Sequence, residues 1–277
     1  LWVAGVLVLS SALSAFVLNL PLFSALGAYL ALLGSGLALA IFLGITWLIA
    51  DRILSEDVVL PARCYAKICG IKTPDMLEEV IQNGATHVGF VFFEKSPRNV
   101  DFETAAQLCE QAKGRISRVG LVVEPSDDDL DNLLAAVDLD MRQVHAHDGA
   151  ARFAAIRART GLPVIAVVSV AEEGDLAAVP DIRKVADGLL FDAKPPKGAE
   201  LPGGNALGFD HRVLAEAKVG NTPWMLAGGL TPDNVTQAIA TTQPTYVDVS
   251  SGVEKDGERG TKDPAKIRTF LAAVARA

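Results

Sequence analysis

The sequence predicts an α/β fold in which residues 65–277 form a (β/α)8 barrel, preceded by an apolar helical segment. After Tyr65, short apolar runs alternate with segments of helical periodicity, which is typical of a parallel sheet with crossover helices. There are eight such runs, and the stretch lies near the lower limit for complete barrels, about 200 residues. An open doubly wound sheet is the alternative, but no GxGxxG motif follows the first strand.

Local signals place the elements of this barrel. The eight strands are expected to begin near Tyr65, His87, Ile116, Met141, Pro163, Val185, Trp224 and Tyr246. Helices are expected to begin where a capping side chain precedes a proline, at Thr73-Pro74, Thr231-Pro232 and Asp263-Pro264. Two segments carry an apolar stripe that indicates one face against a sheet. The stripes are Leu130, Leu133, Leu134 and Val137, and Ile267, Phe270, Leu271 and Val274.

The first fifty residues differ from the rest, because residues 1–50 contain no charged side chain and no histidine. A bilayer span needs about 20 apolar residues, so this segment is long enough for two. We expect a two-helix membrane hairpin at 1–50, a linker at 51–64 and the catalytic barrel at 65–277. The mixed charges after the segment favour only weakly a cytoplasmic barrel anchored to the inner face of the membrane. The alternative is a sequence read from upstream of its true start, since no methionine precedes the barrel.

The charge and cysteine content narrow the class of protein. All charged residues lie in 51–277 and sum to −8, and an acidic surface argues against a nucleic-acid partner. Cys64, Cys69 and Cys109 form no CxxC pair and no cluster at zinc spacing. Neither a disulfide framework nor a structural metal is indicated, and a reducing compartment is the natural location.

The active site of such a barrel lies at the C-terminal ends of its strands, where few polar residues occur here. Cys69 ends the first strand and Asp192 ends the sixth. Lys67 shares a strand face with Cys69, so its ammonium is expected to favour the thiolate and make Cys69 a base near neutral pH. Asp192 is expected to be a general acid that faces Cys69 across the barrel mouth. As structural alternatives, Cys69 is a small buried hydrophobe and Asp192 a capping residue.

Two turns predict a phosphate site. Gly228-Gly229 stands between the seventh strand and a helix start, where backbone N–H groups can point at an anion. Ser250-Ser251-Gly252 forms a second turn after the eighth strand, and these two loops are where barrels usually hold phosphate. The long 193–208 loop is expected to be a lid, a further phosphate loop or a surface excursion. Arg98, after the second strand, is either a carboxylate clamp or a solvated charge.

Six motifs, in order along residues 66–276, resemble the phosphoribosylanthranilate isomerase family. They are Lys67-Ile68-Cys69-Gly70-Ile71, Ser96-Pro97-Arg98, Gln143-Val144-His145, Leu190-Phe191-Asp192, Gly228-Gly229-Leu230-Thr231-Pro232-Asp233-Asn234-Val235 and Val247-Asp248-Val249-Ser250-Ser251-Gly252-Val253-Glu254. The resemblance implies an Amadori rearrangement in tryptophan biosynthesis, which converts N-(5-phosphoribosyl)anthranilate to 1-(2-carboxyphenylamino)-1-deoxyribulose 5-phosphate. It implies a small phosphorylated substrate, no cofactor, no metal, and a monomer or homodimer.

By this resemblance Asp192 protonates the ring oxygen of the ribose, Cys69 removes the proton on C2, and Arg98 holds the anthranilate carboxylate. An acid and a base on opposite sides of one sugar suit an aldose-to-ketose isomerisation. The other substrate-binding residues implied are His145, Gly204, Gly228, Gly229, Asp248, Ser250, Ser251 and Gly252. Two departures leave the loop geometry open, because Ala146 follows His145 where the family has glycine, and the Gly-Gly-Thr-Gly lid reads Gly203-Gly204-Asn205-Ala206.

Two other functions remain open at this point. A related phosphate-binding barrel, acting as an indole-glycerol-phosphate or phosphoribosyl isomerase, would use a carboxylate base, and activity that survives Cys69→Ala would favour it. A catalytically inactive, membrane-tethered binding module is the other alternative. It is disfavoured because Cys69 and Asp192 are both present, although a barrel needs neither for stability. Failure to complement a tryptophan auxotroph would favour the inactive module.

Overall fold

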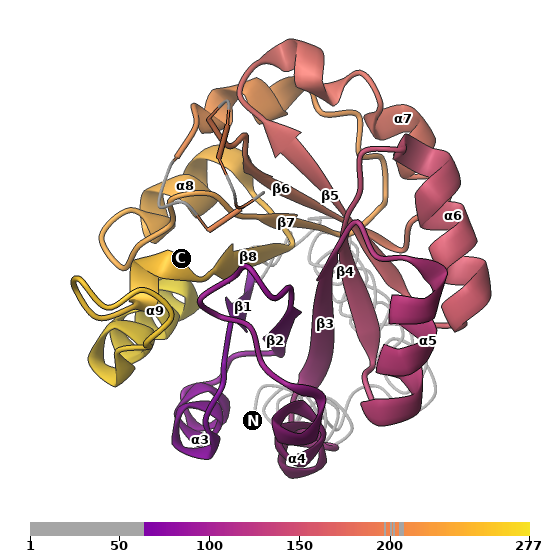
Figure 1. Ribbon diagram of the computed structural model, residues 1–277. Coiled ribbons are helices and arrows are strands. Elements are labelled where there is room, and N and C mark those ends of the chain that lie inside the picture. Colours follow the sequence, from indigo (N-terminus) through magenta and orange to yellow (C-terminus); the bar gives the residue numbers. More distant parts are fainter. Residues whose placement is uncertain (1–63, 197, 200, 202, 205–207) are drawn as a thin grey trace, which may run out of the picture. The chain divides into compact units, whose positions relative to one another are not determined.

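The computed structural model describes residues 64–277 except 197, 200, 202 and 205–207. In this part of the chain eight parallel strands close into one barrel, since β1 pairs with β2 on one side and with β8 on the other (Figure 1). The predicted (β/α)8 barrel is thereby confirmed. The strands are β1 (Tyr65–Cys69), β2 (His87–Phe92), β3 (Ser117–Val123), β4 (Met141–His145), β5 (Val164–Val170), β6 (Gly188–Ala193), β7 (Trp224–Leu226) and β8 (Tyr246–Val249).

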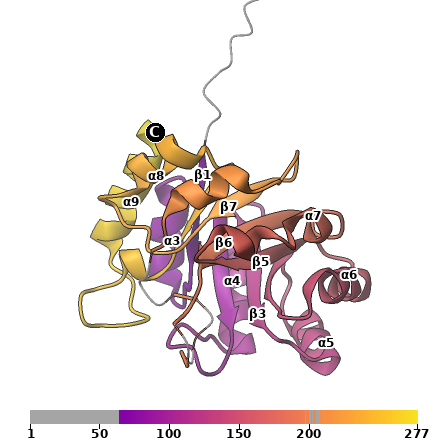
Figure 2. The same ribbon diagram turned by 90° about the horizontal axis from the view of Figure 1, so that it is seen from above.

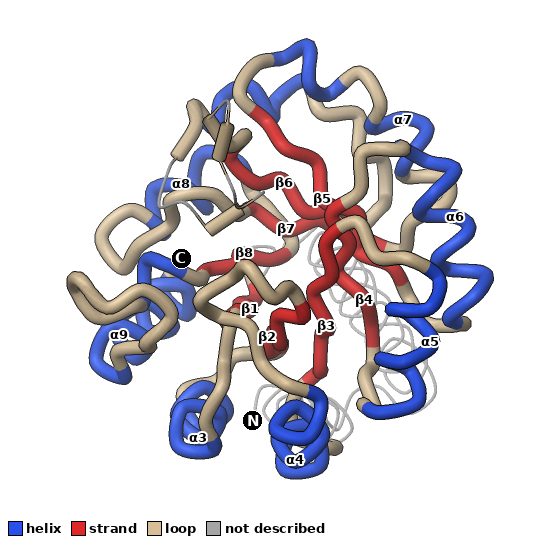
Figure 3. Tube along the Cα trace, viewed as in Figure 1, coloured by secondary structure: helices blue, strands red, loops and turns tan. Residues whose placement is uncertain are grey.

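Helices lie outside the strands, as the blue and red segments of Figure 3 show. Among the described residues, the connections after β5 and β6 contain no long helix, only the four-residue α7 and 3-10 turns. Two of the helices, α8 and α9, lie side by side near the C-terminus (Figure 2). The helices are α3 (Pro74–Gln82), α4 (Phe102–Ala112), α5 (Asp127–Ala136), α6 (Gly149–Thr160), α7 (Val179–Ile182), α8 (Val235–Thr242) and α9 (Pro264–Arg276), and the 3-10 turns are η1 (Glu173–Leu176), η2 (His211–Glu216) and η3 (Ser251–Val253).

The apolar segment 1–50 and residues 51–63 of the expected linker lie outside the described residues. The membrane hairpin and its boundary with the linker therefore stay predictions. Across the residues that the structure does describe, no helix combines the length and the apolar character that a bilayer crossing requires.

The polar interior of the barrel is defined by one hydrogen bond across it. Lys67 of β1 donates to the Gln143 side chain of β4 at 2.7 Å, and because these strands are not neighbours, both side chains point into the barrel. Side chains two positions further along a strand share its direction, so Cys69 and His145 point inward as well. The interior also contains an apolar cluster made of Val119, Ile165, Val167, Leu190, Met225 and Ala227. A larger core lies between the strands and the helices.

Seven of the eight predicted strand starts are confirmed to within one residue. The exception is β6, which begins at Gly188 rather than Val185. Val185 and Ala186 both donate backbone hydrogen bonds to the Ile182 carbonyl, so they still belong to the preceding helical turn. Both predicted apolar stripes are buried, apart from Leu134, which is only partly covered.

The three predicted helix starts have different outcomes. Asp263 accepts hydrogen bonds from the first backbone N–H groups of α9, so this cap is confirmed. Helix α3 begins at Pro74 as predicted, but the Thr73 side chain makes no capping hydrogen bond. The prediction at Thr231-Pro232 is wrong, since α8 begins at Val235. The cause lies in the loop that precedes α8 and is described below.

Candidate active site

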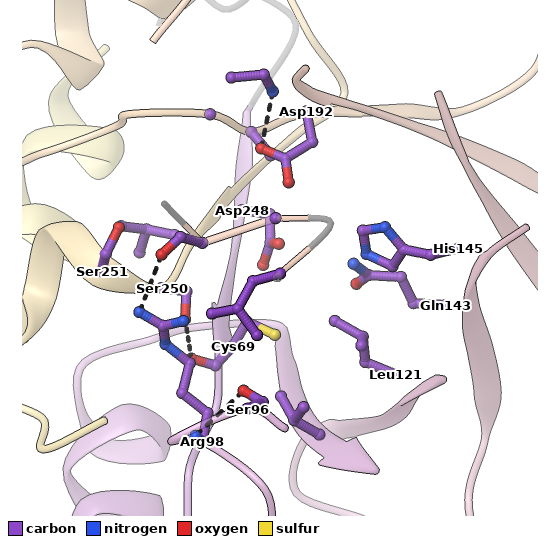
Figure 4. A pocket seen from close by; sticks show the side chains of 18 of the residues that line it. Cys69, Ser96, Arg98, Leu121, Gln143, His145, Asp192, Asp248, Ser250 and Ser251 are labelled. Atoms are coloured by element: carbon purple, nitrogen blue, oxygen red, sulfur yellow. Dashed lines mark hydrogen bonds between the residues drawn. The ribbon is translucent and has the colours of Figure 1, made fainter. Parts of the chain in front are cut away.

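A pocket opens at the C-terminal ends of the strands, where the sequence predicts the active site. Figure 4 shows polar side chains from several strands that converge on it. A Cβ at Gly252, which lies next to the pocket, would fall 1.9 Å from the Leu230 carbonyl oxygen. The other predicted site residues all line the pocket, namely Cys69, Arg98, His145, Asp192, Gly204, Gly228, Gly229, Asp248, Ser250 and Ser251.

Lys67 lies beneath this pocket, two residues before Cys69 on β1. Its ammonium is fully buried and donates to Asp248 at 2.8 Å and to Gln143 at 2.7 Å. Burial lowers the pKa of Lys67, but the adjacent Asp248 carboxylate more than offsets this effect and leaves the pKa raised. The Lys67 ammonium therefore stays charged and holds Asp248 in the pocket wall.

Cys69 ends β1 and lines the pocket (Figure 4). Gly89 of β2 provides the space for its sulfur, because a Cβ at Gly89 would lie 2.8 Å from Sγ. Burial raises the pKa of the Cys69 thiol, and the Lys67 ammonium opposes this shift without reversing it. Lys67 therefore favours the thiolate, as predicted, but it does not bring the pKa of Cys69 below that of an ordinary thiol. The physical reason is that the thiol is buried and that the Lys67 charge is already paired with Asp248.

Asp192 enters the pocket from β6, and β7 and β8 separate it from Cys69 on β1 (Figure 4). Asp192 as a whole is partly exposed, and its Oδ1 accepts a hydrogen bond from the Ala193 N–H at 2.9 Å. Burial raises the pKa of Asp192 to about 7, and the negative charge of Asp248 acts in the same direction. A large share of Asp192 therefore holds a proton near pH 7, as a general acid must.

Arg98 is buried at another side of the pocket, with 4% of its surface exposed, so it is not a solvated loop charge. Its Nε and Nη2 donate to the two carboxylate oxygens of Glu254 at 2.7 and 3.0 Å. Nη2 also donates to the Gly204 carbonyl at 3.3 Å. Its remaining nitrogen, Nη1, makes no hydrogen bond to any residue in the described part of the chain.

Glu254 and Lys262 are two further buried charged residues, and both adjoin Arg98. Neither has a role predicted from the sequence. Lys262 donates to Glu254 at 3.2 Å, so one carboxylate lies between two cations. These three side chains, which we call the Arg98 triad, carry one net positive charge beside the pocket. Glu254 closes the last of the six motifs, whereas Lys262 stands in a run of mixed charges that gave no sign of burial.

The two predicted phosphate turns lie against each other, because Gly252 approaches the Leu230 carbonyl too closely to admit a side chain. Gly228 and Gly229 have φ angles of 82° and 67°, which residues with a side chain rarely adopt. A Cβ at Gly228 would also lie 2.7 Å from the Ala193 backbone nitrogen. Glycine is therefore required in this turn by both conformation and space.

The turn that follows these glycines explains the late start of α8. The Asn234 side chain accepts a hydrogen bond from the Thr231 N–H at 2.8 Å and donates one to the Gly229 carbonyl at 2.9 Å. These bonds hold residues 229–234 in a turn, so the helix cannot begin at Thr231.

His145 lies at the end of β4 in the pocket wall (Figure 4). Burial lowers its pKa to about 4, and the Lys67 charge adds to this effect, so the ring is neutral at pH 7. Ala146, which replaces the glycine of the family pattern, packs against the hydrophobic core and is not part of the pocket lining.

The 193–208 loop reaches the two groups that the sequence analysis singled out. A Cβ at Gly203 would lie 2.3 Å from Oδ2 of Asp192, and one at Gly204 would lie 2.5 Å from Nη1 of Arg98. The loop therefore contacts the expected acid and the expected clamp through backbone alone. The other departure from the family pattern, at 205–206, lies outside the described residues.

Comparison with known proteins gives one consistent result. The family model described as N-(5'-phosphoribosyl)anthranilate isomerase matches residues 66–273. The N-(5'-phosphoribosyl)anthranilate isomerase of Paramagnetospirillum magneticum is 52% identical over 208 residues, which cover 75% of this chain and 95% of that protein.

Solved structures agree with the sequence relatives. Monomers generated from the dimeric isomerase of Thermotoga maritima are 28% identical, with a TM-score of 0.66, and cover 77% of this chain and 100% of that one. The same values hold for an isomerase solved in complex with reduced 1-(o-carboxyphenylamino)-1-deoxyribulose 5-phosphate. The chain therefore belongs to the phosphoribosylanthranilate isomerase family and catalyses its reaction in tryptophan biosynthesis, the conversion of N-(5-phosphoribosyl)anthranilate to 1-(2-carboxyphenylamino)-1-deoxyribulose 5-phosphate.

Proposed function

We propose that Asp192 and Cys69 divide the proton transfers of this rearrangement as general acid and general base. Asp192 gives its proton to the ribose ring oxygen, the bond from that oxygen to C1 breaks, and the anilino nitrogen lone pair forms an iminium with C1. Cys69 then takes the proton from C2, and the electrons of that bond form the enolamine, which tautomerises to the ketone. The observation that carries the proposal is a carboxyl group with a pKa near 7 in the same pocket as a buried thiol.

The raised pKa of Cys69 fits this order of events. A buried thiol is a poor base when the ammonium beside it, here Lys67, is already paired with a carboxylate. Ring opening creates a positive iminium next to C2, and a positive charge close to the sulfur favours the thiolate. Cys69 is thus activated after Asp192 has acted, and Lys67 serves to hold Asp248 rather than to ionise Cys69 in advance.

We further propose that Arg98 binds the anthranilate carboxylate. Glu254 neutralises only one of the two cations in the Arg98 triad, and a buried net charge is costly unless a partner compensates it. Arg98 lines the pocket, and its Nη1 group can donate to a carboxylate oxygen.

The substrate phosphate is proposed to bind between the turns at Gly228-Gly229 and Ser250-Ser251-Gly252. Support comes from their direct contact and from the positive φ angles of Gly228 and Gly229, a backbone conformation that can present N–H groups to an anion. Asp248, His145 and Gly204 complete the proposed binding surface, His145 as a neutral ring and Gly204 through its backbone.

Complementation of a strain that lacks the isomerase tests the proposed roles. The full chain should restore growth without tryptophan, whereas Asp192→Asn and Cys69→Ala should not. Lys184→Met, which removes a surface ion pair at the opposite end of the barrel, serves as the matched control and should grow like the wild type. Growth with Cys69→Ala would reject the thiol as base and favour a carboxylate in its place.

We propose separately that residues 1–50 form a membrane hairpin, that 51–64 form a linker, and that the barrel at 65–277 works on the cytoplasmic face. The support is the complete lack of charge in the first fifty residues. The full chain should then remain with membranes after an alkaline wash, and recovery in the wash would reject the hairpin.

The proposed assembly is a monomer or a homodimer. The Thermotoga maritima isomerase is described as dimeric, which keeps the homodimer open for this chain. Analytical ultracentrifugation of the purified chain separates the two states, and a larger species would reject both.

A further inference from the structure

Lys262 lies behind the pocket lining, where it connects two parts of the site. It precedes α9, and its backbone forms an antiparallel bridge with Glu254. The hydrogen bonds from Lys255 to Thr261 and from Asp263 to Val253 close the same loop on either side of this bridge. Only 2% of the Lys262 side chain is exposed, although lysine is rarely buried in proteins.

The ammonium of Lys262 has three donors, and three oxygen atoms accept from it. Nζ lies 2.8 Å from the Ser250 carbonyl, 3.2 Å from Ser250 Oγ and 3.2 Å from Glu254 Oε1. The Ser250 hydroxyl in turn donates to the Cys69 carbonyl at 3.1 Å. All the bonding capacity of the ammonium is therefore used inside the protein, which leaves none for direct contact with a substrate.

The three acceptors belong to residues that support two different parts of the proposed substrate site. Glu254 holds Arg98, the proposed carboxylate clamp, through two bonds. Ser250 begins the turn proposed to bind phosphate. One buried side chain thus ties the anthranilate end of the site to the phosphate end.

We propose that Lys262 is a positioning residue, which fixes the distance between the Arg98 guanidinium and the phosphate-binding turn at Ser250. The inference rests on the proposed binding roles of Arg98 and of this turn. A ligand that spans both ends requires that distance to be correct, whereas a ligand that occupies one end does not. Removal of Lys262 should therefore weaken spanning ligands selectively.

Binding of two probes tests this inference. The spanning probe is reduced 1-(o-carboxyphenylamino)-1-deoxyribulose 5-phosphate, and the one-ended probe is ribose 5-phosphate. In Lys262→Met, Kd for the spanning probe should rise roughly tenfold, and Kd for ribose 5-phosphate less than about threefold. Lys184→Met, an exposed lysine at the other end of the barrel, should change neither constant.

A double-mutant cycle shows whether Lys262 acts through Arg98. In an Arg98→Met background the effect of Lys262→Met on the spanning probe should shrink to less than about threefold, since the clamp is already gone. An equal loss for both probes, or an undiminished loss in the Arg98→Met background, would overturn the inference in favour of a general structural role. If Lys262→Met does not fold, Lys262→Arg, which keeps the charge but displaces it, enters the same cycle with the same criteria.

Failure of the inference and failure of the proposed clamp give different results. Normal binding of the spanning probe to Lys262→Met, together with weak binding to Arg98→Met, rejects the positioning role alone. Normal binding to Arg98→Met rejects the clamp, and the inference falls with it.

Discussion

Replacement of Asp192 by asparagine should leave only a small residual activity. Relative to the wild type, the variant should be more stable at neutral pH than in acid. The side chains have the same shape, and Oδ1 of the amide can still accept from the Ala193 N–H. What the substitution removes is a carboxyl group whose pKa burial raises from 3.8 to about 7. The change thus isolates the titration of one group.

The sign and size of the effect follow from this shift. Above pH 5 the unfolded carboxyl is ionised, while the folded Asp192 keeps its proton up to about pH 7, so folding takes up a proton. The stability that Asp192 contributes is complete below its unfolded pKa and is lost as the pH rises through 7. Two pH units between 5 and 7 correspond to at most about 2.7 kcal/mol, and the partial exposure of the residue reduces this to about 1–2 kcal/mol.

Urea unfolding of the wild type and of Asp192→Asn at half-unit steps from pH 5 to pH 8 measures this difference. All other titrating groups are common to the two proteins and cancel in the comparison. The difference in unfolding free energy, variant minus wild type, should increase by about 1–2 kcal/mol between pH 5 and pH 7. Above pH 7 it should stay constant. A difference that stays constant over this range would mean that Asp192 is already ionised at pH 5, which would refute its role as a general acid near neutral pH.

Four shorter predictions follow from the same geometry. The kcat/KM of the wild type should fall about tenfold per pH unit above pH 7 as Asp192 loses its proton, and a profile flat to pH 9 would contradict this. Gly203→Ala places a methyl group against Asp192 and should lower kcat/KM roughly tenfold with little change in Tm by calorimetry. Gly252→Ala drives a Cβ into the Leu230 carbonyl and should cost about 1–3 kcal/mol in urea unfolding. Arg142 is fully buried, and its guanidinium has no hydrogen-bond partner among the described residues, so Arg142→Met should stabilise the protein by about 1–3 kcal/mol and leave kcat/KM unchanged.

The barrel could be predicted from the sequence because its signals are local. Strand and helix periodicity, and a capping aspartate such as Asp263, act over a few residues and are visible in any window of that length. The site could be located for a related reason, since a barrel of this type brings all C-terminal strand ends to one face. Where a local signal failed, at Thr231-Pro232, another local contact from Asn234 was stronger.

Charge pairing could not be predicted, because the partners meet only when the barrel closes. Lys67 and Asp248 are 181 positions apart in the sequence, and Arg98 and Glu254 are 156 apart. The sequence pattern placed Lys67 beside Cys69 but could not show that Lys67 would form an ion pair with Asp248. For the same reason Lys262 looked like an ordinary surface lysine until its neighbours were known.

The central claim, that Asp192 opens the ring and Cys69 removes the C2 proton, is tested most directly with N-(5-phosphoribosyl)anthranilate deuterated at C2 of the ribose. The isotope effect on kcat is measured for the wild type, Cys69→Ser and Asp192→Asn. We expect the isotope effect to increase in Cys69→Ser, because proton removal from C2 becomes the slow step, and to approach unity in Asp192→Asn, because ring opening becomes the slow step. An isotope effect that increases in Asp192→Asn and not in Cys69→Ser would contradict the assignment and exchange the two roles.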